Sequence, residues 1–318
     1  MQTRNPHNPE RDRKTAEITE YFFGPVARVS KCHSQTNYCA IVMFEQAIPQ
    51  RLVKLTNYNP HAIEAEIELY PRMAEAGVPV PKIEFTHRDY PSVTDPFMIM
   101  PLFSGAKLTA VCSQDVPDAV AACQSCGRLL RNLDTLFGTE FRELQTTGQS
   151  KEQFTAIQEG LDAPLDVSCL KQVDRRLACS TAEYLDEFRV PIERQLTHGQ
   201  FHTENILTDE ENRICVVDFG ESIALSSPTR DLFYLLWSLQ IWCQRDGNSP
   251  EARAVFDGCG PLSDEEVDQL RYWELVSYVN QANEAAKRSE DLSVVKAKIL
   301  EFIRADSKGF MDWSSFAS

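Results

Sequence analysis

The chain has 318 residues, of which 42% are apolar and 25% charged, a composition typical of a soluble globular protein with a large core. Its 32 Lys and Arg residues are outnumbered by 47 Asp and Glu residues, and the net charge of −15 argues against nucleic acid or anionic membranes as partners and favours cationic ligands. No apolar run approaches the length of a membrane span, and residues 1–14 lack the apolar core of a signal peptide, so the sequence predicts a cytoplasmic protein.

Ten cysteines are scattered along the chain, and its one C-x-x-C pair, Cys123 and Cys126, lies inside a helical pattern with no partner pair. A structural zinc site would need two further ligands at a matching spacing. Buried thiols in a reducing compartment explain the pattern better.

The N-terminal part reads as a helix followed by an antiparallel meander. Residues 1–14 are polar and contain two prolines, which favours a disordered arm. A short helix is predicted over Thr15–Phe23. Three runs rich in β-forming residues then predict strands, at Val26–Ser30, Tyr38–Phe44 and Arg51–Leu55.

A second helix and a fourth strand follow the meander. The pattern over Ala62–Ala76 is helical and is ended by Gly77, although Pro71 inside it is expected to kink or split the helix. Phe97–Gly105 then reads as an apolar strand that leads into a loop.

Beyond residue 105 the pattern is mainly helical. Ser263 and Glu266 form a capping-box pattern at the start of one of these helices. The helices are predicted over Asp115–Phe137, Leu170–Glu187, Leu232–Trp242, Ser263 to about Lys287, and Leu292–Arg304.

The stretch from residue 196 to 231 carries the chemistry. A short apolar run at Ile206 and Leu207, a polar turn over residues 209–212 and a second run at Ile214–Val217 predict a hairpin. Asn205 precedes the first strand and Asp218 follows the second, so strand pairing would bring their side chains together. An amide oxygen and a carboxylate are hard ligands, suited to a Mg²⁺ ion that also holds phosphates.

The spacing of the polar residues in this stretch is that of a kinase catalytic loop. It reads His198-Gly-Gln200-Phe-His-Thr-Glu-Asn205 and is followed by Asp218-Phe-Gly220. With Gly after the His, it resembles the aminoglycoside phosphotransferase and choline kinase-like family, and so does the later segment Pro228-Thr-Arg-Asp-Leu.

The resemblance implies an α+β, bilobal protein kinase-like fold. It implies an N-lobe over residues 15–103 with a small antiparallel sheet, and a mainly helical C-lobe over residues 104–306 that holds the catalytic loop and the acceptor pocket. Residues 1–14 and 307–318 would be tails.

The resemblance also assigns nucleotide-binding roles in the N-lobe. Lys54, on the third predicted strand, matches the lysine that holds the α- and β-phosphates, and Glu66 matches the helix acid that pairs with it. Glu64 and Glu68 are rivals two residues away, but neither would share the helix face of Glu66.

Two further contacts with the nucleotide are implied. Ser34, in the turn after the first strand, could donate to a phosphate. The strand starting at Phe97 corresponds to the hinge that reads adenine through backbone groups. Because Pro101 has no N–H, the amide of Leu102 and the carbonyl of Met100 are the candidates.

Gln200 stands where the family carries its catalytic Asp, and a Gln amide cannot take up a proton near neutral pH. Three explanations are open: a native Gln in a slow kinase or a pseudokinase, an introduced replacement of Glu, or a nearby acid such as Glu204 or Glu221 acting instead. In the family, His198 is a scaffold residue, and Asp231 is expected to brace the loop.

The sequence therefore predicts an ATP- or GTP-dependent O-phosphotransferase with Mg²⁺ as cofactor. The acceptor would be a small, cationic, hydroxylated molecule, such as an aminoglycoside-like antibiotic or an amino alcohol. The alternative is a nucleotide-binding pseudokinase with a regulatory or scaffolding role.

Overall fold

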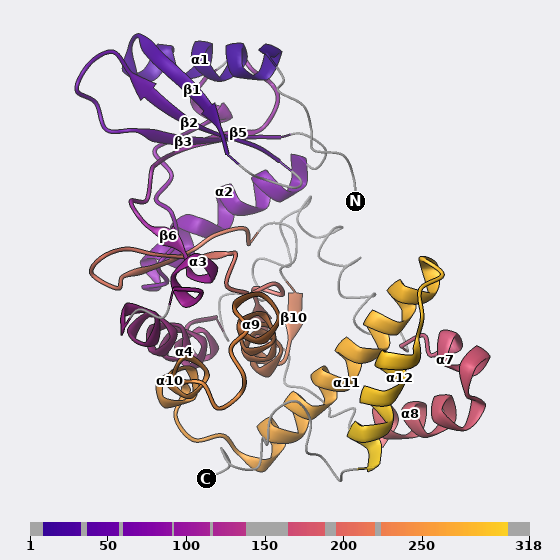
Figure 1. Cartoon of the computed structure of the whole chain (residues 1–318). Coiled ribbons are helices and arrows are strands. Elements are labelled where there is room, and N and C mark those ends of the chain that lie inside the picture. Colours follow the sequence, from indigo (N-terminus) through magenta and orange to yellow (C-terminus); the bar gives the residue numbers. More distant parts are fainter. Residues whose placement is uncertain are drawn as a thin grey trace. The chain divides into compact units, whose positions relative to one another are not determined.

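The computed structural model describes residues 9–32, 37–56, 60–90, 92–114, 117–137, 165–187, 195–219 and 224–304. These residues form two compact units (Figure 1). Of the described residues, the first unit contains those up to 105 together with 215–219, and the second contains those from 106 to 137, from 165 to 214 and from 224 to 304.

A five-stranded antiparallel sheet forms the centre of the first unit. Its strand order is β1-β2-β3-β5-β4. The predicted meander is confirmed, and the strands are β1 (Val26–Lys31), β2 (Tyr38–Phe44), β3 (Arg51–Leu55), β4 (Phe85–Thr86) and β5 (Phe97–Pro101).

Helix α1 (Pro9–Phe23) packs on one face of this sheet, with Ile18 fully buried against it. It begins at Pro9 rather than at Thr15, so residues 9–14 are helical and the expectation of a disordered arm there is wrong. Proline is favoured at the first position of a helix, where an N–H has no intrahelical partner.

Helix α2 (Pro60–Glu75) lies on the other side of the sheet, as Figure 1 shows. Side chains alternate along β3, so Val53 faces the core under α1 and Lys54 faces the side of α2. Pro71 lies inside α2, which is continuous and is not split.

The second unit is mainly helical. Its helices are α3 (Leu108–Cys112), α4 (Pro117–Phe137), α7 (Ser168–Val173), α8 (Arg175–Glu187), α9 (Pro228–Cys243), α10 (Pro250–Cys259), α11 (Asp264–Lys287) and α12 (Ser293–Arg304). Its short strands are β6 (Ala106–Lys107), which pairs with β8 (Ile206–Thr208), and β7 (Gln195–Thr197), which pairs with β10 (Ala224–Ser226).

Two helix boundaries show how local side chains set the fold. The capping box at the start of α11 is present, with Ser263 accepting from the Glu266 N–H and Glu266 accepting from the Ser263 N–H. The helix predicted over Leu170–Glu187 is divided into α7 and α8 at Asp174. The Asp174 carboxylate accepts from the first N–H groups of α8, so it ends one helix and begins the next.

Helices α4 and α10 cross at a pair of glycines. A Cβ built on Gly127 would lie 2.0 Å from the Val255 carbonyl oxygen, and one on Gly258 would lie 2.1 Å from the Gln124 carbonyl oxygen. Only glycine allows backbones this close. No helix among the residues described is long and apolar enough to cross a membrane.

The predicted hairpin turn after β8 is confirmed. The Asp209 N–H donates to the Arg213 carbonyl at 3.1 Å, and the Asp209 carboxylate accepts from the N–H groups of Glu211 and Arg213. Strand β9 (Ile214–Val216) follows. The chain enters the first unit at Cys215, where the Val216 N–H donates to the Pro79 carbonyl at 2.7 Å.

Candidate active site

Three charged side chains meet in the first unit. The Lys54 ammonium donates to both oxygens of Glu66, at 2.9 and 2.8 Å, and to Asp218 Oδ1 at 2.6 Å. Lys54 is 6% exposed and Glu66 is completely buried, whereas the Asp218 side chain is 41% exposed. The predicted pairing of Lys54 with Glu66 is therefore present.

The charges of this cluster stabilise the protonated lysine. Burial alone lowers the pKa of Lys54, but the carboxylates of Glu66 and Asp218 outweigh it and hold that pKa well above its ordinary value. One positive and two negative charges leave the cluster with a net negative charge, so it attracts a further cation.

The two rival acids on α2 face other partners. Glu64 lies 3.0 Å from the His87 ring and 2.9 Å from the Arg88 guanidinium, and Glu68 lies 2.6 Å from Arg88. Residues two positions apart on a helix point in different directions, which is why Glu66 alone of the three contacts Lys54.

Tyr70, one turn after Glu66 on α2, also joins this cluster. Its hydroxyl donates to Glu66 Oε1 at 3.2 Å and accepts the Asp218 N–H at 3.1 Å. Burial and the Glu66 carboxylate raise the pKa of Tyr70 well above its ordinary value, so the hydroxyl stays protonated. Tyr70 was not among the predicted site residues, although its spacing of four from Glu66 was a usable signal.

In the second unit, Asp231 holds the start of the catalytic-loop motif. Its carboxylate accepts the His198 N–H at 2.6 Å and the Gly199 N–H at 2.9 Å. Gly199 has a φ of 78°, which favours glycine. Burial raises the pKa of Asp231 to about 6, although Arg230 and these backbone donors act in the opposite direction. The bracing contact expected for Asp231 is present.

The same loop places Gln200 and Asn205 close together. The side-chain nitrogen of Asn205, Nδ2, donates to the backbone carbonyl of Gln200 at 3.1 Å, and the same carbonyl accepts the His202 backbone N–H at 2.8 Å. The Gln200 side chain is exposed, whereas Asn205 is 8% exposed. Because the side-chain nitrogen of Asn205 already donates a hydrogen bond, the side-chain oxygen of Asn205 is the atom that would bind a cation.

Glu204 is poorly suited to replace a missing base. The Lys107 ammonium donates to Glu204 Oε2 at 2.6 Å. Burial raises the pKa of Glu204, but hydrogen bonds from Lys107 and Thr109 outweigh it, and the net effect is a pKa below its ordinary value. Glu221, the other acid considered, lies outside the described residues.

The predicted hinge has a definite hydrogen-bond pattern. Arg51 lies opposite Pro101 in the β3–β5 ladder, and the next amide, that of Leu102, donates to the Gln50 carbonyl at 3.2 Å. By the alternation of an antiparallel ladder, Pro101 occupies a position where its missing N–H costs no sheet bond. An adenine read by Leu102 would have to replace the bond to Gln50.

Of the other residues predicted to contact the nucleotide, the structure describes Met100 but not Ser34. Met100 is 3% exposed in β5 and lies opposite Leu52, while Ser34 lies outside the described residues. The nucleotide-binding roles of Met100, Leu102 and Ser34 stay predictions.

The metal prediction concerns residues of both units. Asn205 belongs to the second unit and Asp218 to the first, so their joint binding of one cation stays a prediction. Their oxygen atoms form a donor set suited to Mg²⁺. Within the described residues, no group of three His, Cys, Asp or Glu side chains is arranged to hold a metal ion.

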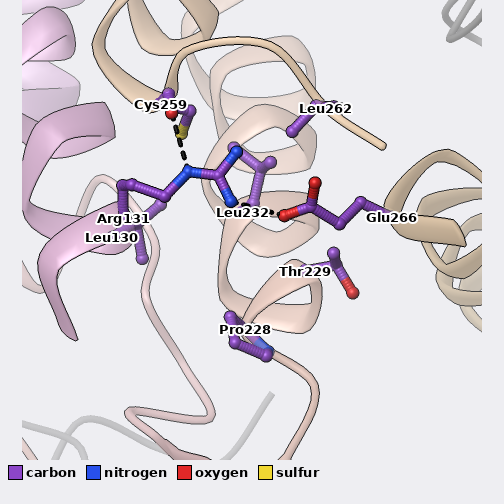
Figure 2. Close-up of a pocket in the computed structure, with 8 residues that line it drawn as sticks. All are labelled: Leu130, Arg131, Pro228, Thr229, Leu232, Cys259, Leu262 and Glu266. Atoms are coloured by element: carbon purple, nitrogen blue, oxygen red, sulfur yellow. Dashed lines mark hydrogen bonds and ion pairs between the residues drawn. The ribbon is translucent and has the colours of Figure 1, made fainter. Parts of the chain in front are cut away.

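The second unit also contains a small, open pocket, which Figure 2 shows. Leu130, Leu232 and Leu262 line it together with an ion pair of 2.6 Å between Arg131 and Glu266. The Arg131 guanidinium also donates to backbone carbonyls at the end of α10 and in the connection to α11. Arg131 thus fastens α4 to this connection, and the pocket contains none of the predicted site residues.

The chain belongs to the phosphotransferase enzyme family known as APH, whose model matches residues 47–274. This family comprises aminoglycoside phosphotransferase and choline kinase-like proteins, as the catalytic-loop spacing predicted. No curated protein matches the chain by sequence.

Several solved structures share its fold. A spectinomycin phosphotransferase in complex with ADP and spectinomycin is 11% identical, with a TM-score of 0.57 over 95% of this chain and 91% of that one. A microcompartment-associated aminopropanol kinase is 14% identical (TM-score 0.57, 94% and 99% covered). A choline kinase from Streptococcus pneumoniae is 11% identical (TM-score 0.52, 92% and 97% covered). The predicted α+β kinase-like fold is confirmed.

Proposed function

We propose that this chain is an ATP- or GTP-dependent O-phosphotransferase that acts on a small, cationic, hydroxylated molecule. The observation that carries the proposal is the preformed cluster of Lys54, Glu66 and Asp218. Phosphoryl transfer requires that the phosphates are held in place, that their charge is neutralised and that the nucleophile is aligned. The cluster would serve the first two requirements, through Lys54 on the phosphates and Asp218 on a cation.

Lys54 would bind the nucleotide phosphates by exchanging one of its partners. An ammonium group has three N–H donors, and all three are used by Glu66 and Asp218. Asp218 is the partner to be replaced, because its side chain is 41% exposed while that of Glu66 is fully buried. Glu66 then keeps Lys54 oriented while one N–H turns to phosphate.

Asp218 and Asn205 would hold Mg²⁺ through oxygen atoms. When bound, the ion neutralises charge on the phosphates. Asp218 would leave Lys54 when it binds the cation, so that each charged group would keep an oppositely charged partner.

Gln200 would orient the acceptor hydroxyl without removing its proton. The Gln200 side chain is exposed, whereas the Gln200 backbone carbonyl accepts a hydrogen bond from the Asn205 side-chain nitrogen. A positioned base contributes typically about 10²–10⁴-fold. The transition state of phosphoryl transfer is loose and requires little early deprotonation, so we expect slow transfer rather than none.

The acceptor class is inferred from charge and from the relatives. The net charge of −15 favours a cationic molecule over an anionic one. The similar structures named above include a spectinomycin phosphotransferase, an aminopropanol kinase and a choline kinase. A panel of aminoglycosides and amino alcohols is therefore the first set of acceptors to test.

The test has two stages. Thermal shift with ATP and with GTP, each with and without Mg²⁺, measures nucleotide binding. Turnover of the acceptor panel by Gln200→Asp is then compared with wild type and with Gln200→Asn, which has the size of the Asp variant but no charge. We expect nucleotide stabilisation, and a rate for the Asp variant at least about 100-fold above that of the Asn variant.

The alternative is a nucleotide-binding pseudokinase, which the non-basic Gln200 specifically favours. Stabilisation by nucleotide, with no acceptor phosphorylated by wild type, Gln200→Asp or Gln200→Glu, would support it over the phosphotransferase. If no nucleotide stabilises the protein, both functions are wrong.

A further inference from the structure

Tyr70 joins two charged residues of the site through one oxygen atom. Its hydroxyl lies 3.2 Å from Glu66 Oε1 and 3.1 Å from the Asp218 backbone nitrogen. Resting on the proposed function, we propose that Tyr70 is a positioning residue. It holds the Asp218 backbone in place so that the carboxylate can move from Lys54 to the cation.

The chemistry of the three groups fixes the direction of both bonds. An ionised carboxylate only accepts hydrogen bonds, so the single hydroxyl proton of Tyr70 goes to Glu66. The oxygen lone pairs are then free to accept the Asp218 N–H. Glu66 itself is anchored by two bonds from Lys54, so the hydroxyl has a fixed support on α2.

Asp218 needs such support because of its backbone conformation. Its φ is +70°, in the left-handed region that non-glycine residues seldom adopt, although Asp tolerates it better than most. Its carboxylate is held by Lys54 and its backbone N–H by Tyr70. When the carboxylate leaves Lys54 for the cation, the bond to Tyr70 remains and keeps the backbone conformation.

The simpler interpretation is that Tyr70 is only a core residue. It is 2% exposed, and its ring lies edge-on to the Phe219 ring with centroids 6.2 Å apart. Packing needs the ring but not the hydroxyl, so Tyr70→Phe separates the two roles. The variant keeps the ring and removes the oxygen atom that accepts the Asp218 N–H.

Tyr278→Phe is a matched control in the second unit. Tyr278 is a buried tyrosine on helix α11 whose hydroxyl donates to Glu274, four residues earlier, at 2.7 Å. The two variants remove the same group from the same helical spacing, but only Tyr70 contacts Asp218. Both are expected to lower Tm.

The experiment measures the Mg²⁺ concentration that gives half-maximal stabilisation by ATP, in a thermal-shift titration. We expect Tyr70→Phe to raise this concentration about 10-fold, corresponding to the loss of about one hydrogen bond at the metal ligand, and Tyr278→Phe to leave it within twofold of wild type. A fall in Tm without a change in this concentration would mean that Tyr70 is only structural.

Amide exchange in the wild-type chain gives a second test that needs no variant. The Asp218 N–H is expected to exchange slowly because it donates to a buried hydroxyl. Fast exchange would overturn the inference even if Tyr70→Phe fails to fold. If the wild-type chain binds no nucleotide, both the proposed function and the role of Tyr70 are wrong. If wild type binds nucleotide and Tyr70→Phe needs the same Mg²⁺ concentration as wild type, only the role of Tyr70 is wrong.

Discussion

Removal of the Lys54 ammonium would expose how the site depends on buried charge. Lys54→Met keeps a side chain of similar length but leaves the Glu66 carboxylate fully buried without its cation. In the wild-type protein this carboxylate receives two hydrogen bonds from Lys54, at 2.9 and 2.8 Å, and one from Tyr70 at 3.2 Å. The variant retains only the last of these three.

The expected loss of stability follows from the burial of that charge. Breaking a buried ion pair by removing one partner costs about 3–5 kcal/mol, because an uncompensated charge stays in the interior. In the variant, burial favours the neutral carboxyl over the ionised one, so protonation relieves the cost as the pH falls. The loss should therefore be largest near pH 8 and smaller near pH 5.

A double-mutant cycle measures this directly. Urea unfolding of wild type, Lys54→Met, Glu66→Gln and the double variant gives the four free energies of unfolding. The double variant buries no lone charge, so it should be more stable than Lys54→Met. A loss below about 1 kcal/mol in Lys54→Met, independent of pH, would refute a buried, charge-dependent pair.

Two further predictions concern the second unit. Because the pKa of Asp231 is raised to about 6, the Asp231 carboxyl binds its proton more tightly in the folded protein than in the unfolded chain. As the pH rises from 5 to 7, the free energy of unfolding of wild type should therefore fall by about 1 kcal/mol relative to that of Asp231→Asn. Denaturation at both pH values checks this, and a difference that grows in favour of wild type with pH would contradict it. Gly127→Ala should lower the free energy of unfolding by about 2 kcal/mol, because its Cβ would lie 2.0 Å from the Val255 carbonyl oxygen and the clash outweighs the gain in helix propensity. Differential scanning calorimetry would show this as a lower Tm, and an unchanged or higher Tm would mean that the two helices separate easily.

The sequence predicted the parts of the fold that depend on short-range patterns. The meander strands, the capping box at Ser263 and the hairpin turn before Arg213 follow from side-chain alternation and turn chemistry, which act over a few residues. The pairing of Lys54 with Glu66 was also predictable, because a family motif and a helix face both pointed to it.

The features that were missed depend on competing or distant interactions. Asp174 lies in a helical pattern, and its side chain divides α7 from α8 by capping the second helix. Helix α10 was not predicted, although its N-cap Ser249 was a signal. The bond from Asp218 to Tyr70 joins residues 148 positions apart, which no local pattern reveals.

The central claim is that Asn205 and Asp218 bind one divalent cation together with a nucleoside triphosphate. A crystal structure with a non-hydrolysable ATP analogue and Mn²⁺, located by its anomalous signal, tests it most directly. The account predicts a metal peak about 2.0–2.2 Å from the Asn205 carbonyl oxygen and from an Asp218 oxygen, with phosphate oxygens completing its coordination. A nucleotide bound with its metal away from either residue, or no bound nucleotide, would contradict the account.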